Sequence, residues 1–310
     1  MIAPVRIDRE QLLRLLTFWL RPDFVLRVVA RFQSVAGFDR SMGLASSAMT
    51  ATIPITILVG ALLPVPSDTA SRIIERYELS GDGAEAVRDA FQPISDVDTS
   101  LGIIGFLLLV FSLLSFTRAM QRLIESAWEL APMSIRNTVG GAKWLLALIL
   151  YLGVTGVVVS LIDVGPREML AKIAVIPITF AFFIWSAMTL SSGRLKASDV
   201  IPFAAVAAVL LALYEFGASF YTPTAFNSYA SRYGVIGVVF AMISALFGLM
   251  LAIVASAAVG REVRVELDNI RDGIRPSDDE IKKQWDIVIE GARIRRDAVR
   301  EQLGRLRRTR

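Results

Sequence analysis

The sequence of 310 residues contains no cysteine and no histidine. These absences exclude a disulfide framework, a thiolate nucleophile, a Ser-His-Asp triad and a zinc site with histidine ligands. No glycine-rich phosphate loop of the Walker type is present either, so an ATP-driven pump would need another subunit. Carboxylates with a hard metal ion could still support hydrolysis, but nothing in the sequence favours it. We therefore expect no catalytic residue, no metal site, no cofactor and no enzymatic activity.

Long apolar stretches dominate the sequence, and its mean hydropathy is +0.56. Six of them lie between charged segments, at 43–63, 101–116, 142–162, 173–190, 200–221 and 235–259. A helix needs roughly 20 apolar residues to cross a hydrocarbon core about 30 Å thick, and most of the stretches reach that length. The sequence therefore predicts an all-α membrane protein. A bundle of six transmembrane helices at 41–262 would lie between a leader at 1–40 and a charged tail at 263–310.

Positive charge is distributed unevenly between the two ends of the predicted helices. Of the 33 Lys and Arg residues, 27 lie before span one, between spans two and three (with Lys143 at the border), between spans four and five, and after Val259. The other three connections carry 6. Because Lys and Arg accumulate on the cytoplasmic side of membrane proteins, both termini are predicted to be cytoplasmic. Such a face suits anionic lipid headgroups better than nucleic acid.

The leader has two short apolar patterns, at 12–20 and 24–32, which Pro22 separates. Their spacing predicts two amphipathic helices. These helices would either lie on the inner leaflet or pack against cytoplasmic loops, and periodicity does not separate the two alternatives. In the first case four arginines would point toward lipid phosphates: Arg14, Arg21, Arg27 and Arg31.

The predicted external loop, 64–100, is rich in acidic residues. Helical spacing at 71–77 and 84–91, around the breaker at 80–83, predicts a small helical cap outside the membrane. Its charges are typical of a solvated surface, with a vestibule that collects cations as the alternative.

Pro54 lies in the middle of the first span, where it removes a hydrogen bond and crowds the carbonyl of Thr50, so the helix is expected to kink. Ser46, Ser47 and Thr50 lie close to it in sequence. Their hydroxyls could satisfy a freed carbonyl or line a polar transport path. A purely structural kink is the alternative, because proline is common in membrane helices.

Glu215 is the acidic residue that lies well inside a predicted span. An ionised carboxylate in hydrocarbon is costly, so Glu215 should face the bundle interior or water, or stay protonated. We therefore regard it as the leading candidate for the transport path. An interhelical hydrogen bond, or a position shallow enough to meet water at the outer leaflet, is the alternative.

After the second span, Arg118, Arg122, Glu125 and Glu129 recur at helical spacing and predict one charged stripe. Such a stripe is usually a row of surface ion pairs. Beside the inner leaflet, Arg118 and Arg122 could instead bind a lipid phosphate, because arginine suits phosphate geometry.

The tail is predicted to break at 273–277 and to resume as a helix at 278–308. Its apolar residues recur in steps close to three and four, which indicates an imperfect coiled coil or a docking helix. A solvated helix, or one on the lipid surface, is the alternative, and the basic end at 305–310 could hold anionic headgroups.

Four short features of the sequence stand out: Leu44-Ala45 followed by Pro54, the run 118–130 with Trp128, the Tyr-Gly-Val-Ile-Gly turn at 233–237, and Gly260-Arg261-Glu262. Together they resemble the YihY/BrkB family of bacterial inner-membrane proteins. The resemblance covers residues 30–265. Three departures indicate a divergent member. Ser46 and Ser47 stand where the family favours aromatics, Glu125 stands where it favours Asn, and the Tyr-Pro pattern is missing from 184–190.

This resemblance implies a multi-pass protein of the inner membrane, and roles in envelope or lipid transport have been suggested for the family. An older label, a ribonuclease that processes transfer RNA, fits poorly because the basic tail has no stacking aromatic except Trp285. We predict the transport or export of a lipid-like or amphiphilic envelope component, with membrane lipids and no nucleic acid as partners. The alternative is a scaffold that recruits a cytoplasmic partner through 278–308, and a homo-oligomer stays open.

Overall fold

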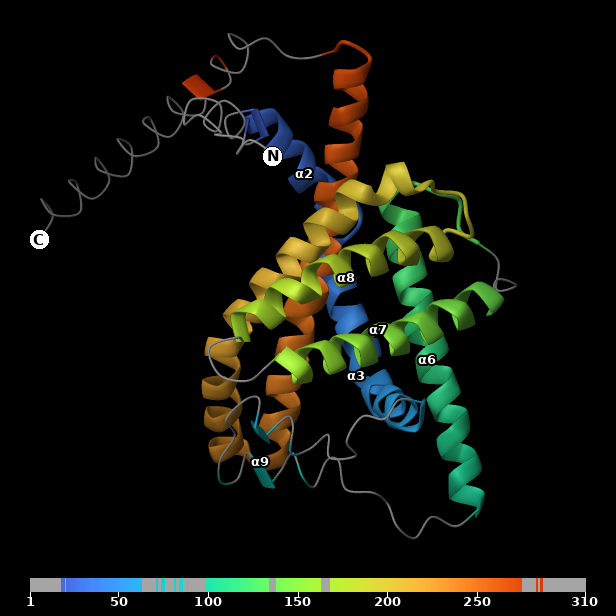
Figure 1. Ribbon diagram of the computed structural model, residues 1–310, viewed down its shortest axis with the longest axis vertical. Helices are drawn as coiled ribbons and strands as arrows, with labels where there is room; N and C mark the ends of the chain where they lie inside the picture. The colour runs from blue at the N-terminus through green and yellow to red at the C-terminus, as the bar shows by residue number, and fades with distance from the viewer. Residues whose placement is uncertain are drawn as a thin grey trace, which may run out of the picture. The chain divides into compact units, whose positions relative to one another are not determined.

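The computed structural model describes residues 18–19, 21–62, 99–133, 138–162 and 168–274, with isolated positions between 71 and 88 and between 283 and 286. Every regular element among these residues is an α-helix, as the sequence predicts (Figure 1). The helices are α2 (Pro22–Ser34), α3 (Gly37–Leu62), α6 (Thr99–Ala127), α7 (Thr138–Ile162), α8 (Glu168–Leu190) and α9 (Ala197–Arg271). The chain divides into two compact units, Phe32–Arg264 and Met1–Arg31 with Val265–Arg310.

Four of the described helical segments are long and apolar enough to cross a membrane: Gly140–Val159, Ile173–Leu190, Ala197–Gly234 and Ile236–Arg271. The prediction of an all-α membrane protein is therefore confirmed. The first two predicted spans, 43–63 and 101–116, fall within α3 and α6, and much of their length lies outside the residues whose side chains are described. The external loop at 64–100 and the tail helix at 278–308 lie almost wholly outside the described residues.

Helix α9 contains the predicted spans five and six and continues beyond the ends of both. It is a hairpin of two long arms that reverses at Gly234, whose φ of 57° and ψ of −136° suit glycine. The arms are antiparallel: Asp199 pairs with Arg264 at 3.2 Å, and the Tyr214 hydroxyl donates to the carbonyl of Ala245. A β-carbon on Gly260 would overlap the backbone of Phe203, so the arms nearly touch there. The residues at 222–234, between the fifth and sixth predicted spans, are helical up to the turn because the first arm extends to it.

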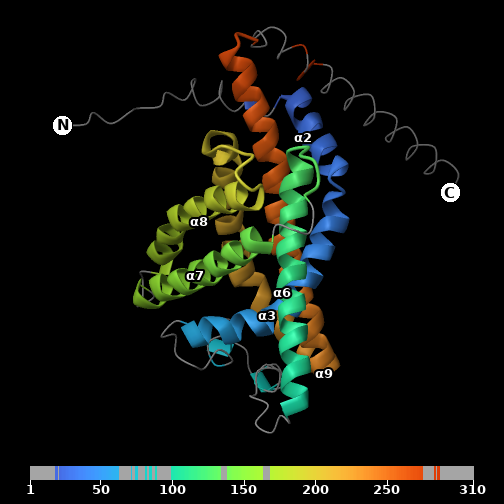
Figure 2. The same cartoon turned by 90° about the vertical axis from the view of Figure 1, so that its right-hand side faces the viewer.

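The core of the larger unit joins residues from α3, α6, α7, α8 and α9. Small residues on α3, among them Ala45, Ala48 and Ala51, let this helix approach its neighbours closely, as alanine does in membrane bundles. Trp144 of α7 is 1 % exposed, and its indole N–H donates to the Ser186 hydroxyl of α8 at 2.9 Å. The antiparallel pair α7 and α8 crosses α6 obliquely (Figure 2).

The later part of α3 turns away from the direction of its beginning (Figure 2), and Pro54 belongs to this helix. The side chain of Pro54 lies outside the described residues. The bend agrees with the predicted kink. Whether the kink serves a transport path stays a prediction.

The smaller unit combines parts of the leader and the tail, which the sequence presented as separate segments. Helix α2 begins at Pro22, a residue that suits the first helical position, and buries Phe24. The last turns of α9, from Val265 to Arg271, belong to the same unit. The first of the two predicted leader helices, at 12–20, lies mostly outside the described residues.

Candidate functional site

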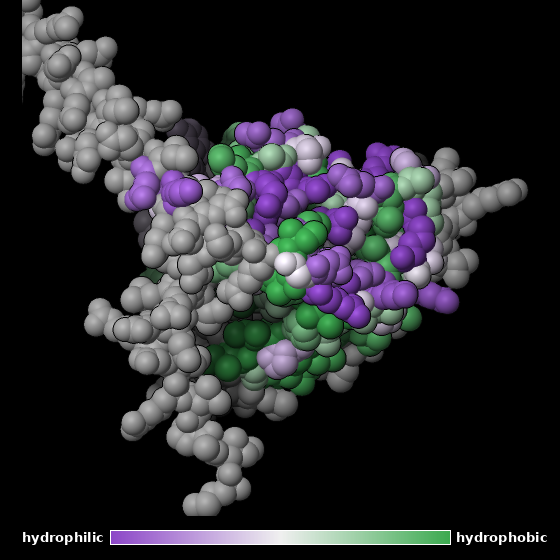
Figure 3. All heavy atoms as spheres, turned by 90° about the horizontal axis from the view of Figure 1, so that it is seen from above, coloured by the Kyte–Doolittle hydropathy of each residue, from purple (hydrophilic) through white to green (hydrophobic). Residues whose placement is uncertain are grey.

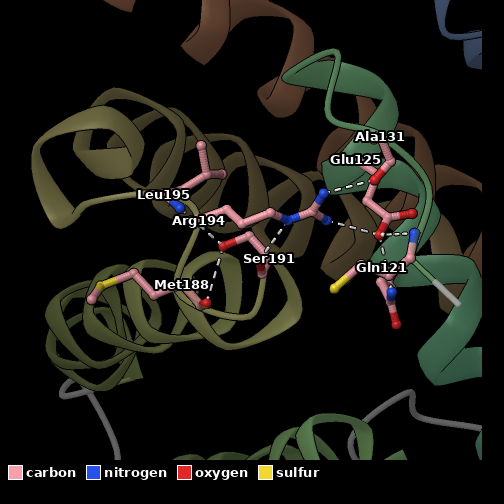
Figure 4. Close-up of polar contacts among 8 residues, drawn as sticks. Gln121, Glu125, Ala131, Met188, Ser191, Arg194 and Leu195 are labelled. Atoms are coloured by element: carbon pink, nitrogen blue, oxygen red, sulfur yellow. Dashed lines mark hydrogen bonds and ion pairs between the residues drawn. The ribbon is translucent and has the colours of Figure 1, made fainter. Parts of the chain in front are cut away.

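Glu125, near the end of α6, is the centre of a polar cluster (Figure 4). Its residue is 5 % exposed. One carboxylate oxygen, Oε1, accepts hydrogen bonds from the Gln121 amide at 3.0 Å, the backbone N–H of Met133 at 3.1 Å and the Arg194 guanidinium at 3.0 Å. A buried carboxylate with three donors is electrostatically satisfied.

Arg194 comes from the turn between α8 and α9, where Ser192 and Gly193 both have positive φ. Besides Glu125, its guanidinium donates to the carbonyls of Ser191 at 2.9 Å and Ala131 at 2.7 Å (Figure 4). One side chain thus joins the turn after α8 to the segment after α6. The planar group of donors in arginine suits this task, and lysine could not make the same three contacts.

The predicted stripe after span two was wrong in its pairing. Glu125 is buried and pairs with Arg194, 69 positions later, so it is not part of a surface row with Arg118 and Arg122. Glu129 lies beyond the end of α6 with a φ of 54°. Arg118 and Arg122 are both exposed, which leaves their guanidinium groups accessible for a headgroup.

Arg40, at the start of α3, lies near Arg122. It donates to the carbonyl of Val35 at 2.9 Å and to the Ser126 hydroxyl at 3.3 Å. Burial, and to a lesser extent the charge of Arg122, lowers the pKa of Arg40. Exposed polar residues gather at this end of the helices, among them Lys196 and Ser198, and the view onto it shows a largely hydrophilic face (Figure 3).

In the smaller unit, Glu266 is 1 % exposed and binds two arginines through one oxygen, Oε2. Arg21 and Arg27 each approach it to 2.6 Å. Arg21 is itself 3 % exposed and lies over the Phe18 ring, 4.6 Å from its centroid. Arg21 therefore does not point outward to lipid phosphates. The alternative of a leader on the inner leaflet expected that it would. This leader helix and the tail are held together by a buried ion pair.

A third polar cluster lies among the membrane helices. The Tyr151 hydroxyl of α7 and the Thr179 hydroxyl of α8 are 2.9 Å apart, and the Tyr151 ring stacks on Phe182. The charge of Glu215, on the first arm of α9, acts on Tyr151 through space. Its side chain is exposed, so it is not enclosed in the bundle interior.

Among the described residues, no interaction joins the candidate hydroxyls on α3 to this cluster. Ser46 and Thr50 are exposed and Ser47 is half-buried. The Thr50 hydroxyl donates to the carbonyl of Ser47 at 2.9 Å, so it is satisfied within its own helix. A polar path along this helix stays a prediction.

These helices define the class of the molecule, an all-α membrane protein. Residues 28–280 match the family model described as Virulence factor BrkB, so the chain belongs to the BrkB family. The resemblance seen in the sequence is thereby confirmed, over a slightly longer range. Comparisons with curated proteins and with solved structures gave no significant match.

Two features of these clusters were not apparent from the sequence. The first is the role of Arg194, which follows the turn Ser192-Gly193, as the partner of Glu125. The second is the role of Glu266, one helical turn after Glu262, as the partner of two arginines. An acid placed where the family favours Asn, at Glu125, was the one signal that pointed to a specific partner. The partner itself is too distant in sequence to be inferred.

Proposed function

We propose that this BrkB-family protein is a six-span protein of the inner membrane, with both termini in the cytoplasm, that moves a lipid-like or amphiphilic envelope component. Helices α3 and α6 contain 26 and 29 residues, which is enough to add two spans to the four apolar segments. The distribution of 27 and 6 basic residues supports the assignment of faces.

The observation that carries the transport proposal is the position of Glu215. Residue 215 follows residue 199 by 16 positions and precedes residue 234 by 19, which is about 24 Å and 28 Å along a helix. The exposed carboxylate therefore lies near the middle of an apolar arm. A charged residue at this depth is costly unless it has a function or a partner, so it marks a site on the substrate path.

The exposed Arg118 and Arg122, with Arg40 nearby, offer a second contact for the substrate. Arginines at the cytoplasmic ends of the helices would bind anionic headgroups before or after passage. The proposal thus has an intramembrane acid at Glu215 and basic residues at one entrance.

The test replaces Glu215 in the full-length protein. Glu215→Gln keeps the size of the side chain and its hydrogen-bonding capacity, so the protein should insert and keep its thermal stability while lipid translocation in vesicles falls to background. Glu129→Gln, at an exposed acid outside the helices, is the matched control and should transport normally. Full transport by Glu215→Gln, together with a loss of stability in Glu215→Leu, would make the residue structural and remove the proposal's main support.

The proposed topology has its own test. Reporter fusions at Arg310 and after Lys196 should read as cytoplasmic, and a fusion near Asp82 should read as external, because of the positive-inside asymmetry. An external C-terminus would reverse the assignment of both faces.

The second candidate is a scaffold that recruits a cytoplasmic partner through 278–308. It is favoured by the compact unit that Arg21, Arg27 and Glu266 hold together, since such a unit could present the tail to a partner. If this candidate, a scaffold without transport, is correct, removal of 278–310 would abolish its function in cells, and the purified protein would translocate no lipid. A transporter would show the opposite dependence, on Glu215 and not on the tail.

A further inference from the structure

Arg40 of α3 and Arg122 of α6 bring two positive charges together at one end of these helices. The Arg40 guanidinium donates through Nη2 to the Ser126 hydroxyl at 3.3 Å. Arg122 precedes Ser126 by one helical turn on the same face of α6, a spacing that puts their β-carbons about 6 Å apart. Burial, and then the charge of Arg122, lowers the pKa of Arg40, which agrees with this closeness. Two guanidinium groups from different helices therefore lie beside one serine.

Within the described part of the chain, no carboxylate neutralises these two charges. Neither Arg40 nor Arg122 forms an ion pair with a described acid. Glu125, about one turn along α6 from Arg122, is buried and already bound to Arg194. Asp39 is exposed next to Arg40 in the sequence and forms no ion pair with it. Because like charges repel each other, an anion from outside the chain would stabilise this pair of arginines.

Three donor groups at this place are available to such an anion. Arg40 uses Nε for the carbonyl of Val35 and Nη2 for Ser126, which holds the guanidinium in position and leaves Nη1. The Ser126 hydroxyl accepts the bond from Arg40, so its own proton can be donated. Arg122 is exposed and donates to no described residue. A group with three acceptor oxygens and more than one negative charge matches these donors.

The same face of α6 continues into an apolar surface. Arg118 precedes Arg122 by four residues and Phe111 precedes Arg118 by seven, spacings that keep all three on one side of the helix. Arg118 is exposed, and Phe111 is 72 % exposed. At about 1.5 Å per residue, Phe111 lies about 16 Å from Arg122 along the helix. A ligand with an acyl chain can bind at Arg122 and also cover Phe111, which a free phosphate would leave uncovered.

We propose that Arg40, Arg122 and Ser126 bind the phosphate monoester of an anionic lipid at this end of α3 and α6. The inference rests on the proposed function, in which these arginines contact an anionic headgroup, and it names the class of that headgroup. A phosphate monoester has three free oxygens and a charge of about −1.5 to −2 at pH 7. It can therefore accept from both guanidinium groups and from the serine hydroxyl at once. A phosphodiester has two free oxygens and a single charge, so it leaves one donor unmatched.

The experiment measures which lipids the full-length protein retains. The protein would be placed in nanodiscs that contain equal amounts of phosphatidic acid, phosphatidylglycerol and phosphatidylcholine with identical acyl chains, extracted, and analysed by native mass spectrometry. The wild type should retain phosphatidic acid about tenfold over phosphatidylglycerol, as one additional charge-assisted hydrogen bond allows. Phosphatidylglycerol is the critical comparison, because it is anionic but carries a diester. Equal retention of the two anionic lipids would overturn the proposal.

A second arm separates a lipid from soluble phosphate as the source of the monoester. The same nanodiscs are treated with an excess of inorganic phosphate before extraction. The preference for phosphatidic acid should persist, because the acyl chains keep the lipid beside the site. Loss of the preference would overturn the assignment to a lipid and make soluble phosphate the ligand.

Variants then assign the preference to residues. Arg122→Gln should abolish it at unchanged thermal stability, since this side chain is exposed. Arg122→Lys should keep part of it, because lysine retains the charge without the planar pair of donors. Arg232→Gln, at an exposed arginine beside the turn of α9, is the matched control and should keep all of it. An unchanged preference in Arg122→Gln would contradict the site.

The outcomes separate this inference from the transport proposal. A preference for phosphatidic acid that depends on Arg122, in a protein that does not translocate lipid, supports the phosphate site and removes transport. Translocation that depends on Glu215 but shows no preference for phosphatidic acid removes the phosphate site and leaves transport standing.

Discussion

Two acidic residues on the long helices, Glu125 and Glu215, have opposite environments. Glu125 is buried near the end of α6 and receives three hydrogen bonds, one of them from Arg194. Glu215 is exposed in the middle of an apolar arm, and among the described residues its charge acts on Tyr151. The charge of the first acid is compensated by its hydrogen-bond donors, whereas the second has no such donors among the described residues.

This difference separates structure from function. A satisfied buried acid holds elements together, and its removal leaves an unpaired arginine and open backbone groups. An acid without such partners contributes less to stability, and in an apolar helix it is a candidate for a binding or transport role. The following predictions test whether the two residues divide in this way.

The largest effect is expected from Glu125→Ala. The change leaves Arg194 and the Met133 N–H without their acceptor, and we expect a loss of about 2 to 3 kcal/mol, less than for a fully buried pair because the Arg194 side chain is 30 % exposed. Unfolding in detergent measures the loss. Arg122→Ala, at an exposed arginine of the same helix, is the control and should stay close to wild type.

The double variant Glu125→Ala with Arg194→Ala sharpens this result. Since the two residues share one interaction, the double variant should be less destabilised than the sum of the single variants. Additive effects would mean that the two side chains act independently.

A smaller effect is expected at the hairpin of α9. Gly260→Ala adds a β-carbon that overlaps the backbone of Phe203, so the arms must separate, at about 1 to 2 kcal/mol. Gly156→Ala is the control, because a β-carbon there meets nothing within 4 Å and alanine favours the helix. Equal stability of the two variants would show that the arms do not touch at Phe203.

Tyr151→Phe tests the hydroxyl pair beside Glu215. It removes one hydrogen bond with Thr179 but keeps the ring stacked on Phe182, so stability should fall by about 0.6 kcal/mol, the average for such bonds in membranes. Tyr229→Phe, at an exposed tyrosine, is the control.

The smallest effect on stability is expected from Glu215→Gln. Because the carboxylate pairs with no described Lys or Arg, its loss should leave the thermal midpoint of the purified protein unchanged. A clear drop in the midpoint would place Glu215 in the same category as Glu125 and end the contrast between them.

Much of the fold could be predicted from the sequence because membrane insertion depends on local properties. The lengths of the apolar stretches predicted α7, α8 and both arms of α9. The turn named at 233–237 contains Gly234, where the chain reverses. The full length of α9 was not apparent from the sequence. Hydropathy detects where apolar residues stop, whereas α9 continues through polar residues such as Asn227 and Arg264, which are supported by packing and ion pairs.

The candidate site was less predictable. Glu215 stood out, because a single acid in an apolar stretch is visible in the sequence itself. The pair Tyr151 and Thr179 did not, since a tyrosine and a threonine in apolar helices are unremarkable until two helices place their hydroxyls 2.9 Å apart. The stripe after span two failed for the same reason, because helical spacing shows which residues share a helix face but not what packs against that face.

The sequence by itself determined that the protein is helical, belongs in a membrane and resembles the BrkB family, because apolar length, charge asymmetry and short motifs are read along the chain. The tertiary structure alone decided which charges are paired. Arg194 reaches Glu125 across 69 positions and Arg27 reaches Glu266 across 239, distances in sequence that no local pattern spans. The physical reason is that an ion pair is defined by a few ångströms in space, and only the packing of the helices sets those.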